Sequence, residues 1–147
     1  MKRLTILALV FTLILPIVSA GTFDEIFNEY KNMENAEYVK IPKFLMKLAG
    51  NKAEVPDDLP IKGKVSGMRI LNITDIGNDT GKRINDSAKN LAAKNNMQEM
   101  LRHTSDGEEC RIWFSMSKDK VKEIYLLYTE PDEVSLLEFT GNFRLTD

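Results

Sequence analysis

The sequence contains one cysteine and one histidine in 147 residues, and this scarcity excludes several chemistries. An intramolecular disulfide needs two cysteines, so the chain is not a disulfide scaffold. A structural zinc site needs four ligands, which one histidine and one cysteine do not supply. A Ser-His-Asp or Cys-His mechanism would have to use His103, and nothing marks a nearby serine as a nucleophile. We therefore expect Cys110, which alternates with Ile112 and Phe114, to be a small buried hydrophobic residue.

Glycine and proline are also few, at 8 and 5 residues, which excludes collagen-like and low-complexity chains. Neither sign of charge dominates, because 20 basic residues face 22 acidic ones and the formal net charge is −2. A nucleic-acid binder normally carries a basic excess, so no nucleic-acid partner is expected. We also expect no cofactor and no metal ion, and composition alone indicates one ordinary globular domain.

The first twenty residues have the pattern of a signal peptide. Lys2 and Arg3 are followed by an apolar run from Leu4 to Val18, and small residues then precede a cleavage position after Ala20. We expect a single mature domain over residues 21–147, located in the periplasm or secreted. A retained membrane anchor is the alternative, but the run is shorter than the ~20 residues of a spanning helix. Removing Lys2 and Arg3 leaves 18 basic against 22 acidic residues, a net charge of −4.

The first half of the mature chain predicts helices and short strands. A capping-box pattern, with Thr22 as N-cap and Glu25 three residues later, predicts a helix over 22–33. Its apolar residues recur at helical spacing, as do those of a third helix from Thr80 to about Asn95. Between them the sequence predicts a strand at 36–41, a helix from Pro42 to about Gly50, a polar loop at 51–63 and a strand at 65–73.

The second half predicts an antiparallel meander, so the expected fold class is α+β with this sheet packed against two or three N-terminal helices. Strands are expected near 98–104 and 108–117, joined at Asp106-Gly107, and two further strands follow turns at 118–120 and 130–133. Register is fixed by keeping apolar residues on one face. We therefore expect Ser117 to pair with Val121, and Thr129 with Val134. This register places six residues on the expected core face under the helices: Ile112, Phe114, Ile124, Leu126, Leu137 and Phe139.

The same register places a second apolar group on the opposite face. Trp113 lies across from Tyr125, Leu127 lies across from Leu136, and Met100 is expected nearby. A solvated sheet face would carry polar residues there. Either an N-terminal helix or loop covers this face, or it is a surface for an unknown envelope protein or for self-association.

Several short motifs match chemistry only weakly. Residues 77–83 resemble a phosphate loop, but the glycine spacing is one residue short and Arg83 stands where Ser or Thr should bind magnesium. Residues 75–86 resemble a calcium loop without its required glycine. Adjacent acids at 57–58 and 108–109 are typical of solvated turns. Asp86-Ser87-Ala88 fits a short bacterial O-glycosylation signal, which makes Ser87 a candidate modification site.

Two motifs carry a resemblance to a known family. The chain opens with Phe-Asp-x-x-Phe-x-x-Tyr over residues 23–30 and closes with Phe-Thr-Gly-Asn-Phe over residues 139–143. With the segments between them, these resemble domain-of-unknown-function family 4252, whose members are small exported proteins of Bacteroidota. The resemblance implies one α+β domain in a Gram-negative envelope, and it supplies no catalytic residues.

Three classes of function are therefore open. The leading hypothesis is a non-enzymatic exported module that binds an envelope protein, a peptide or another component through the Trp113/Tyr125 face or the first helix. The second is a small-ligand binder with a pocket between sheet and helices. The third is a carboxylate hydrolase, which needs two acids in one cleft.

Overall fold

The computed structural model describes residues 22–48 and 61–145 of the chain. The expected signal peptide and the loop acids at 57–58 lie outside the described residues. Three helices and six strands are described, in the order α2 (Asp24–Tyr30), β1 (Ala36–Ile41), α3 (Lys43–Leu48), β2 (Ile61–Thr74), α4 (Asn78–Lys94), β3 (Gln98–Ser105), β4 (Glu108–Ser117), β5 (Lys120–Thr129) and β6 (Glu133–Leu145). The predicted α+β class is confirmed.

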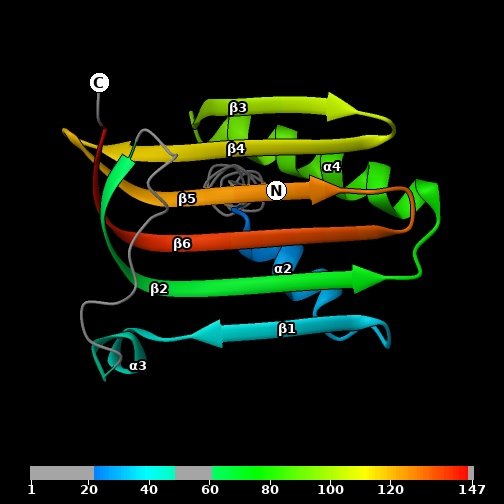
Figure 1. Cartoon of the computed structure of the whole chain (residues 1–147), viewed down its shortest axis with the longest axis horizontal. Coiled ribbons are helices and arrows are strands. Elements are labelled where there is room, and N and C mark those ends of the chain that lie inside the picture. The colour runs from blue at the N-terminus through cyan, green and yellow to red at the C-terminus, as the bar shows by residue number, and fades with distance from the viewer. Residues whose placement is uncertain (1–21, 49–60, 146–147) are drawn as a thin grey trace, which may run out of the picture.

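All six strands form one antiparallel sheet in the order β1-β2-β6-β5-β4-β3 (Figure 1). Strands β3 to β6 are the predicted meander. Strand β2 pairs along β6, which joins the two predicted N-terminal strands to the same sheet. Strands β1 and β3 are therefore the two edges, and the last strand, β6, lies in the interior of the sheet.

The side-chain pairing within the meander follows the predicted register except at local bulges. Phe114 faces Ile124 and Trp113 faces Tyr125, as expected from the alternation. Ser117 faces Lys120, however, and not Val121, because a bulge between Ser115 and Met116 takes up one residue near the turn. Such a bulge shifts pairing locally and leaves the rest of the ladder unchanged.

Helices α2 and α4 lie side by side on one face of the sheet, and this face is opposite to the one expected (Figure 1). The main core lies between these helices and the Trp113/Tyr125 face. It includes Phe23 and Phe27 of the α2 segment and Ile84 of α4, all at most 1% exposed. The residues predicted to lie under the helices, such as Phe114 and Ile124, belong to a second core on the other face.

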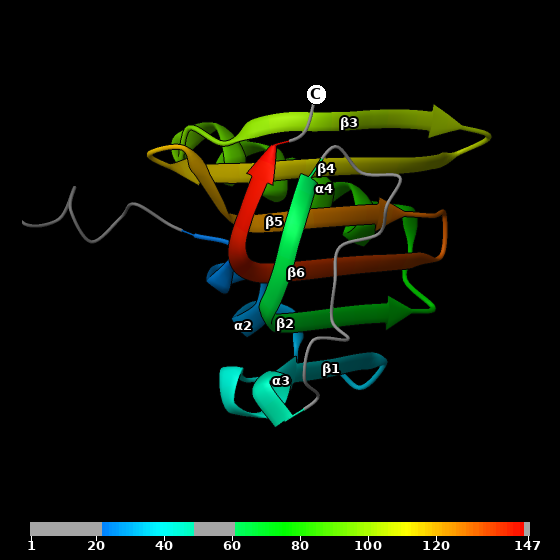
Figure 2. The ribbon, with the colours of Figure 1, turned by 60° about the vertical axis from the view of Figure 1, so that its left-hand side comes forward.

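That second core forms because the sheet folds over on itself. The first part of β2 and the last part of β6 curve across the face opposite α2 and α4 (Figure 2), where Ile61, Val65 and Phe143 pack against residues of β4 and β5. Glycine permits this close approach, because a Cβ on Gly141 would stand 2.5 Å from the carbonyl oxygen of Lys64. The sheet is therefore apolar on both faces, with α2 and α4 covering one face and its own strand ends covering part of the other.

Candidate ligand-binding site

The proposed interaction surface is part of the main core. Trp113 and Tyr125 are each 4% exposed, Leu127 is 1% exposed and Leu136 is fully buried. Phe23 at the start of α2 packs on both aromatic rings. An N-terminal helix therefore covers this face, as one of the two interpretations expected. The other interpretation, an exposed interaction surface, is wrong for these four residues.

Met100 does not join them. A bulge between Glu99 and Leu101 interrupts the pairing of β3 with β4, and Met100 packs against the second core, on the face opposite α2 and α4. Alternation with a period of two fails wherever a bulge adds a residue, which is why the sequence placed Met100 on the wrong face.

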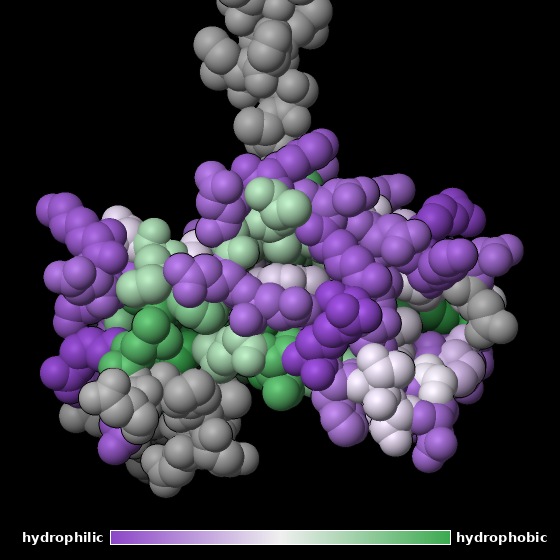
Figure 3. Space-filling view, turned by 90° about the horizontal axis from the view of Figure 1, so that it is seen from above, coloured by the Kyte–Doolittle hydropathy of each residue, from purple (hydrophilic) through white to green (hydrophobic). Residues whose placement is uncertain are grey.

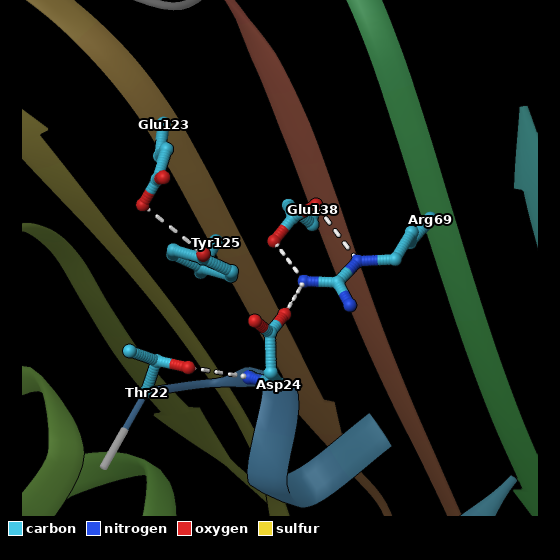
Figure 4. A network of polar contacts seen from close by, with 6 residues as sticks. All are labelled: Thr22, Asp24, Arg69, Glu123, Tyr125 and Glu138. Carbon is cyan, nitrogen blue, oxygen red and sulfur yellow. Dashed lines mark hydrogen bonds and ion pairs between the residues drawn. The ribbon is translucent and has the colours of Figure 1, made fainter. Parts of the chain in front are cut away.

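A network of charged residues lies at the end of the helix-covered face where α2 begins (Figure 4). Lys40 of β1, Arg69 of β2, Glu138 of β6 and Tyr125 of β5 stand in one row across four strands. The Arg69 guanidinium donates from Nε to Glu138 Oε1 at 2.8 Å and from Nη2 to Glu138 Oε2. The same Nη2 lies 2.6 Å from Asp24 Oδ1 of α2.

Arg69 thereby connects helix and sheet. Its guanidinium carbon lies 4.1 Å from the centroid of the Phe27 ring, so the flat cation stacks over the core beneath it. Burial alone would lower the pKa of Arg69, but the hydrogen bonds and charges of Glu138 and Asp24 outweigh burial and raise it. Side-chain exposure is 13% for Arg69 and 9% for Glu138, so this is a largely buried ion pair.

Tyr125 and Glu123 extend the network along β5 (Figure 4). The Tyr125 hydroxyl donates to Glu123 Oε2 at 3.1 Å. Burial raises the pKa of Tyr125, and the negative charges of Glu138 and Glu123 raise it further, so the hydroxyl is a permanent donor. Thr22 completes the edge of the site, where its Oγ1 accepts a hydrogen bond from the Asp24 backbone N–H at 3.2 Å.

Around these residues the surface is hollowed into a basin of about 430 Å³. One wall is the start of α2, a second is the junction between β1 and α3, and the floor is formed by β2, β6 and β5. Three cationic and three anionic side chains line it, together with one buried tyrosine: Lys40, Lys43, Arg69, Asp24, Glu123, Glu138 and Tyr125. This basin is the candidate functional site, and it lies between sheet and helices as the small-ligand hypothesis requires.

The charges of the basin fall into two groups. Arg69, Glu138 and Asp24 neutralise one another through their ion pairs. Glu123, Lys40 and Lys43 make no ion pair among the described residues, so their charges are available to a ligand. The basin does bring carboxylates together, which is the geometric condition set for the hydrolase hypothesis.

A second polar cluster joins α4 to β3 and β4. Arg111 is buried. Its guanidinium donates from Nη1 to Glu99 Oε1 at 2.9 Å and from Nε to Glu109. Asn85 of α4 donates to the other oxygen of Glu109 at 3.0 Å. Burial would raise the pKa of Glu109, but the hydrogen bond and charge of Arg111 outweigh it and lower the pKa. This cluster borders a hollow of about 510 Å³ and ties the helix to the sheet.

The other sequence candidates lie apart from the basin. His103 is exposed on the edge strand β3, and Ser87 is exposed on α4. Cys110 is half-buried, and burial raises the pKa of its thiol, so a buried hydrophobic role is confirmed only in part. Among residues 22–48 and 61–145 there is no group of metal-ligating side chains. In the same ranges no helix is both long and apolar enough to cross a membrane.

The sequence interpretation missed Arg69 and Glu138. Each sits inside an apolar strand segment at a position that alternation assigns to a buried face. A charged residue at such a position needs a partner, and two of opposite sign predict an ion pair. That signal was present, but pairing them requires knowing that β2 lies beside β6.

Comparison with known proteins gives one match. The family model described as Domain of unknown function (DUF4252) matches residues 30–147. Neither a curated protein nor a solved structure matches the chain.

Proposed function

Because this chain belongs to the DUF4252 family, a domain of unknown function, we propose that it is an exported, non-enzymatic binding module whose ligand is a short peptide held in the basin. The observation that carries the proposal is the separation of unpaired charge across the basin: Glu123 on β5 at one side, Lys40 and Lys43 at the other. A peptide with free termini carries the complementary charges, an ammonium at one end and a carboxylate at the other.

The spacing supports a ligand of about four residues. Strands β2 and β6 separate β1 from β5, so three strand spacings of about 4.8 Å put about 14 Å between the two sides. An extended peptide advances about 3.4 Å per residue, so about four residues span the basin. The amino terminus is then at Glu123, whose carboxylate has lone pairs beyond the one that accepts the Tyr125 hydroxyl. The carboxyl terminus is at Lys40 and Lys43.

Binding without catalysis is supported by how the carboxylates are held. Acid catalysis needs a carboxyl group that stays protonated near neutral pH, usually in an apolar setting. Glu138 is instead bonded through both oxygens to Arg69, and Asp24 is 61% exposed beside the same cation. The sole histidine lies on β3, outside the basin lining.

Export to the periplasm or beyond is supported by the N-terminal pattern. The apolar run from Leu4 to Val18, the two preceding basic residues and the small residues before Gly21 are what a signal peptide requires. The full chain should therefore lose its first twenty residues when a Gram-negative host produces it. Intact-mass measurement of the envelope product tests this, and a product that keeps Met1 to Ala20 would refute cleavage after Ala20.

Peptide binding is tested with tetra-alanine, which has free termini and no charged side chain. In an amide ¹H–¹⁵N spectrum, titration should shift the signals of Thr22, Asp24, Lys40 and Glu123. N-acetylation or C-amidation of the peptide should each weaken binding by about fivefold or more, because each removes one charge-assisted contact.

Matched variants assign the two ends. In Glu123→Gln, N-acetylation of the peptide should no longer weaken binding, whereas C-amidation should weaken it as in the wild type. In Lys43→Gln, C-amidation should no longer weaken binding, whereas N-acetylation should. Glu133→Gln and Lys94→Gln, neither of which alters a residue of the basin lining, serve as controls that should bind as the wild type does. Equal binding of the doubly capped peptide would overturn the proposed ligand class. Cleavage of tetra-alanine that Glu123→Gln abolishes would overturn the non-enzymatic role.

A further inference from the structure

Exposed hydrophobic side chains gather around α3. Among the described residues, four of the seven large hydrophobic side chains that are clearly exposed belong to the ten residues 39–48: Val39, Phe44, Leu45 and Leu48, with the other three at positions 101, 116 and 145. Phe44 is 65% exposed and Leu48 is 80% exposed. Isolated exposed residues are normal, but four within one short segment define a patch. We call these four residues the α3 patch.

The patch is firmly attached to the domain. Met46, on the same helix, is 7% exposed and packs in the second core, so α3 is anchored through one side chain while its other apolar residues face outward. Figures 1 and 2 show α3 beside the β1 edge of the sheet, at the opposite edge from β3. The surface seen from above, on the β3 side, is mostly hydrophilic (Figure 3).

The sequence around the patch carries charge of one sign. Between positions 38 and 53 the sequence carries four lysines, at 40, 43, 47 and 52, and no acidic residue. Lys40 and Lys43 are both exposed. This basic stretch occurs in a chain whose net charge is −2, so the lysines are concentrated here against the trend of the whole molecule.

We propose that the α3 patch docks on the surface of an anionic phospholipid bilayer, with Phe44, Leu45 and Leu48 entering the interface and the flanking lysines facing lipid headgroups. Aromatic and leucine side chains beside lysines are the combination that interfacial helices use. Lysines near the surface add electrostatic attraction to anionic lipid. The contact is peripheral. The four patch residues lie outside the basin lining, whereas Lys40 and Lys43 belong both to that lining and to the lysines beside the patch.

The test is co-flotation of the full chain, as recovered from the envelope of a producing host, with vesicles of two compositions. Vesicles of equimolar phosphatidylcholine and phosphatidylglycerol should bind the protein, and pure phosphatidylcholine vesicles should bind at least about tenfold less. High salt should reduce the binding, because it screens the lysines. The double variant Phe44→Ser, Leu48→Ser should bind the anionic vesicles at least about tenfold more weakly.

Controls separate the patch from other contributions. Leu101→Ser removes an exposed hydrophobic residue from the β3 edge and should bind as the wild type does. All variants keep the same N-terminus, so any residual leader contributes equally to each. If the double variant fails to fold by circular dichroism, Phe44→Trp replaces it, and its added emission should shift to shorter wavelength only with anionic vesicles.

Three results would overturn the proposal: equal binding by wild type and double variant, equal binding to both vesicle types, or no blue shift from Phe44→Trp. Self-association in the absence of lipid, abolished by the double variant and unaccompanied by vesicle binding, would also overturn it and assign the patch to a second copy of the chain. The double variant keeps Lys40 and Lys43, and neither Phe44 nor Leu48 lines the basin, so a result with tetra-alanine does not decide this one.

Discussion

Phe23 and Tyr125 stack face to face, with ring centroids 4.0 Å apart and planes inclined by 12°. Phe23 immediately precedes α2, and Tyr125 stands in the middle of β5, so this stack fixes the start of the helix on the sheet. The Trp113 ring lies 6.0 Å from Phe23 and is tilted by 46°. Offset and tilted aromatic contacts at these separations stabilise a core beyond the area they bury. The three rings form one aromatic cluster under α2.

Trp113 should accordingly be inaccessible to solvent quenchers. It is the sole tryptophan and is 4% exposed, so acrylamide and iodide should quench its fluorescence far less in the folded protein than after unfolding in urea. Trp113→Ser should lower the free energy of unfolding by about 3–5 kcal/mol, the cost of emptying a large core site. Quenching as strong as that of free indole would contradict the buried position.

The Arg69–Glu138 pair should be costly to break and cheap to replace as a unit. Arg69→Met leaves a carboxylate in a site with 9% exposure, so the free energy of unfolding should fall by about 3–5 kcal/mol. The double variant Arg69→Met, Glu138→Leu should recover most of that loss, as a double-mutant cycle in urea will measure. Asp24→Asn should cost less than about 1 kcal/mol, because Asp24 is 61% exposed. Additive losses in the double variant would contradict a coupled pair.

Glu109 should make stability depend on acid pH. Its pKa is lowered from the ordinary value of 4.5, because Arg111 outweighs the opposing effect of burial. A carboxyl whose pKa is depressed by folding stabilises the folded state above its unfolded pKa, and this contribution is lost as pH falls through the folded pKa. The difference in free energy of unfolding between wild type and Glu109→Gln should therefore be larger at pH 7 than near pH 3. A difference that is constant with pH would show that Arg111 does not hold this carboxylate.

Two glycine substitutions should act with opposite sign. At Gly141 a Cβ would stand 2.5 Å from the Lys64 carbonyl oxygen and 2.6 Å from the Phe143 ring. Gly141→Ala should therefore destabilise the protein by about 1–3 kcal/mol. At Gly81, within α4, the nearest atom is 3.4 Å away, so Gly81→Ala should stabilise by about 0.5–1 kcal/mol. Thermal unfolding of both variants measures this, and equal shifts would mean that crowding at the strand bend is unimportant.

Much of the sheet could be predicted because alternation constrains register strongly. Pairings such as Leu127 with Leu136 follow from keeping apolar side chains on one face, and they are found as expected. The sequence did not reveal which face α2 and α4 cover. Both faces of the sheet are apolar, so the alternation of side chains fits helices on either face equally well. The curvature that places Phe143 over the second core depends on close backbone approach, which no periodicity reports.

The candidate site was harder to predict than the fold. Arg69 and Glu138 are 69 residues apart in sequence, and they meet only because β2 and β6 are neighbours in the sheet. Thr22 was expected as the N-cap, but Phe23 occupies that position and makes no side-chain cap. The Thr22 hydroxyl accepts a bond from the backbone N–H of Asp24. Its place at the edge of a basin follows from the packing of α2 on the sheet, which local sequence does not encode.

The place of β6 has a consequence for how the chain acquires its fold. It is the last of the described strands along the chain, yet it lies between β2 and β5, so the described sheet cannot close until this strand is available. Pairing over such long sequence separations makes folding slow. Until β6 has been made, neither β2 nor β5 has its neighbour on that side, so the nascent sheet stays open.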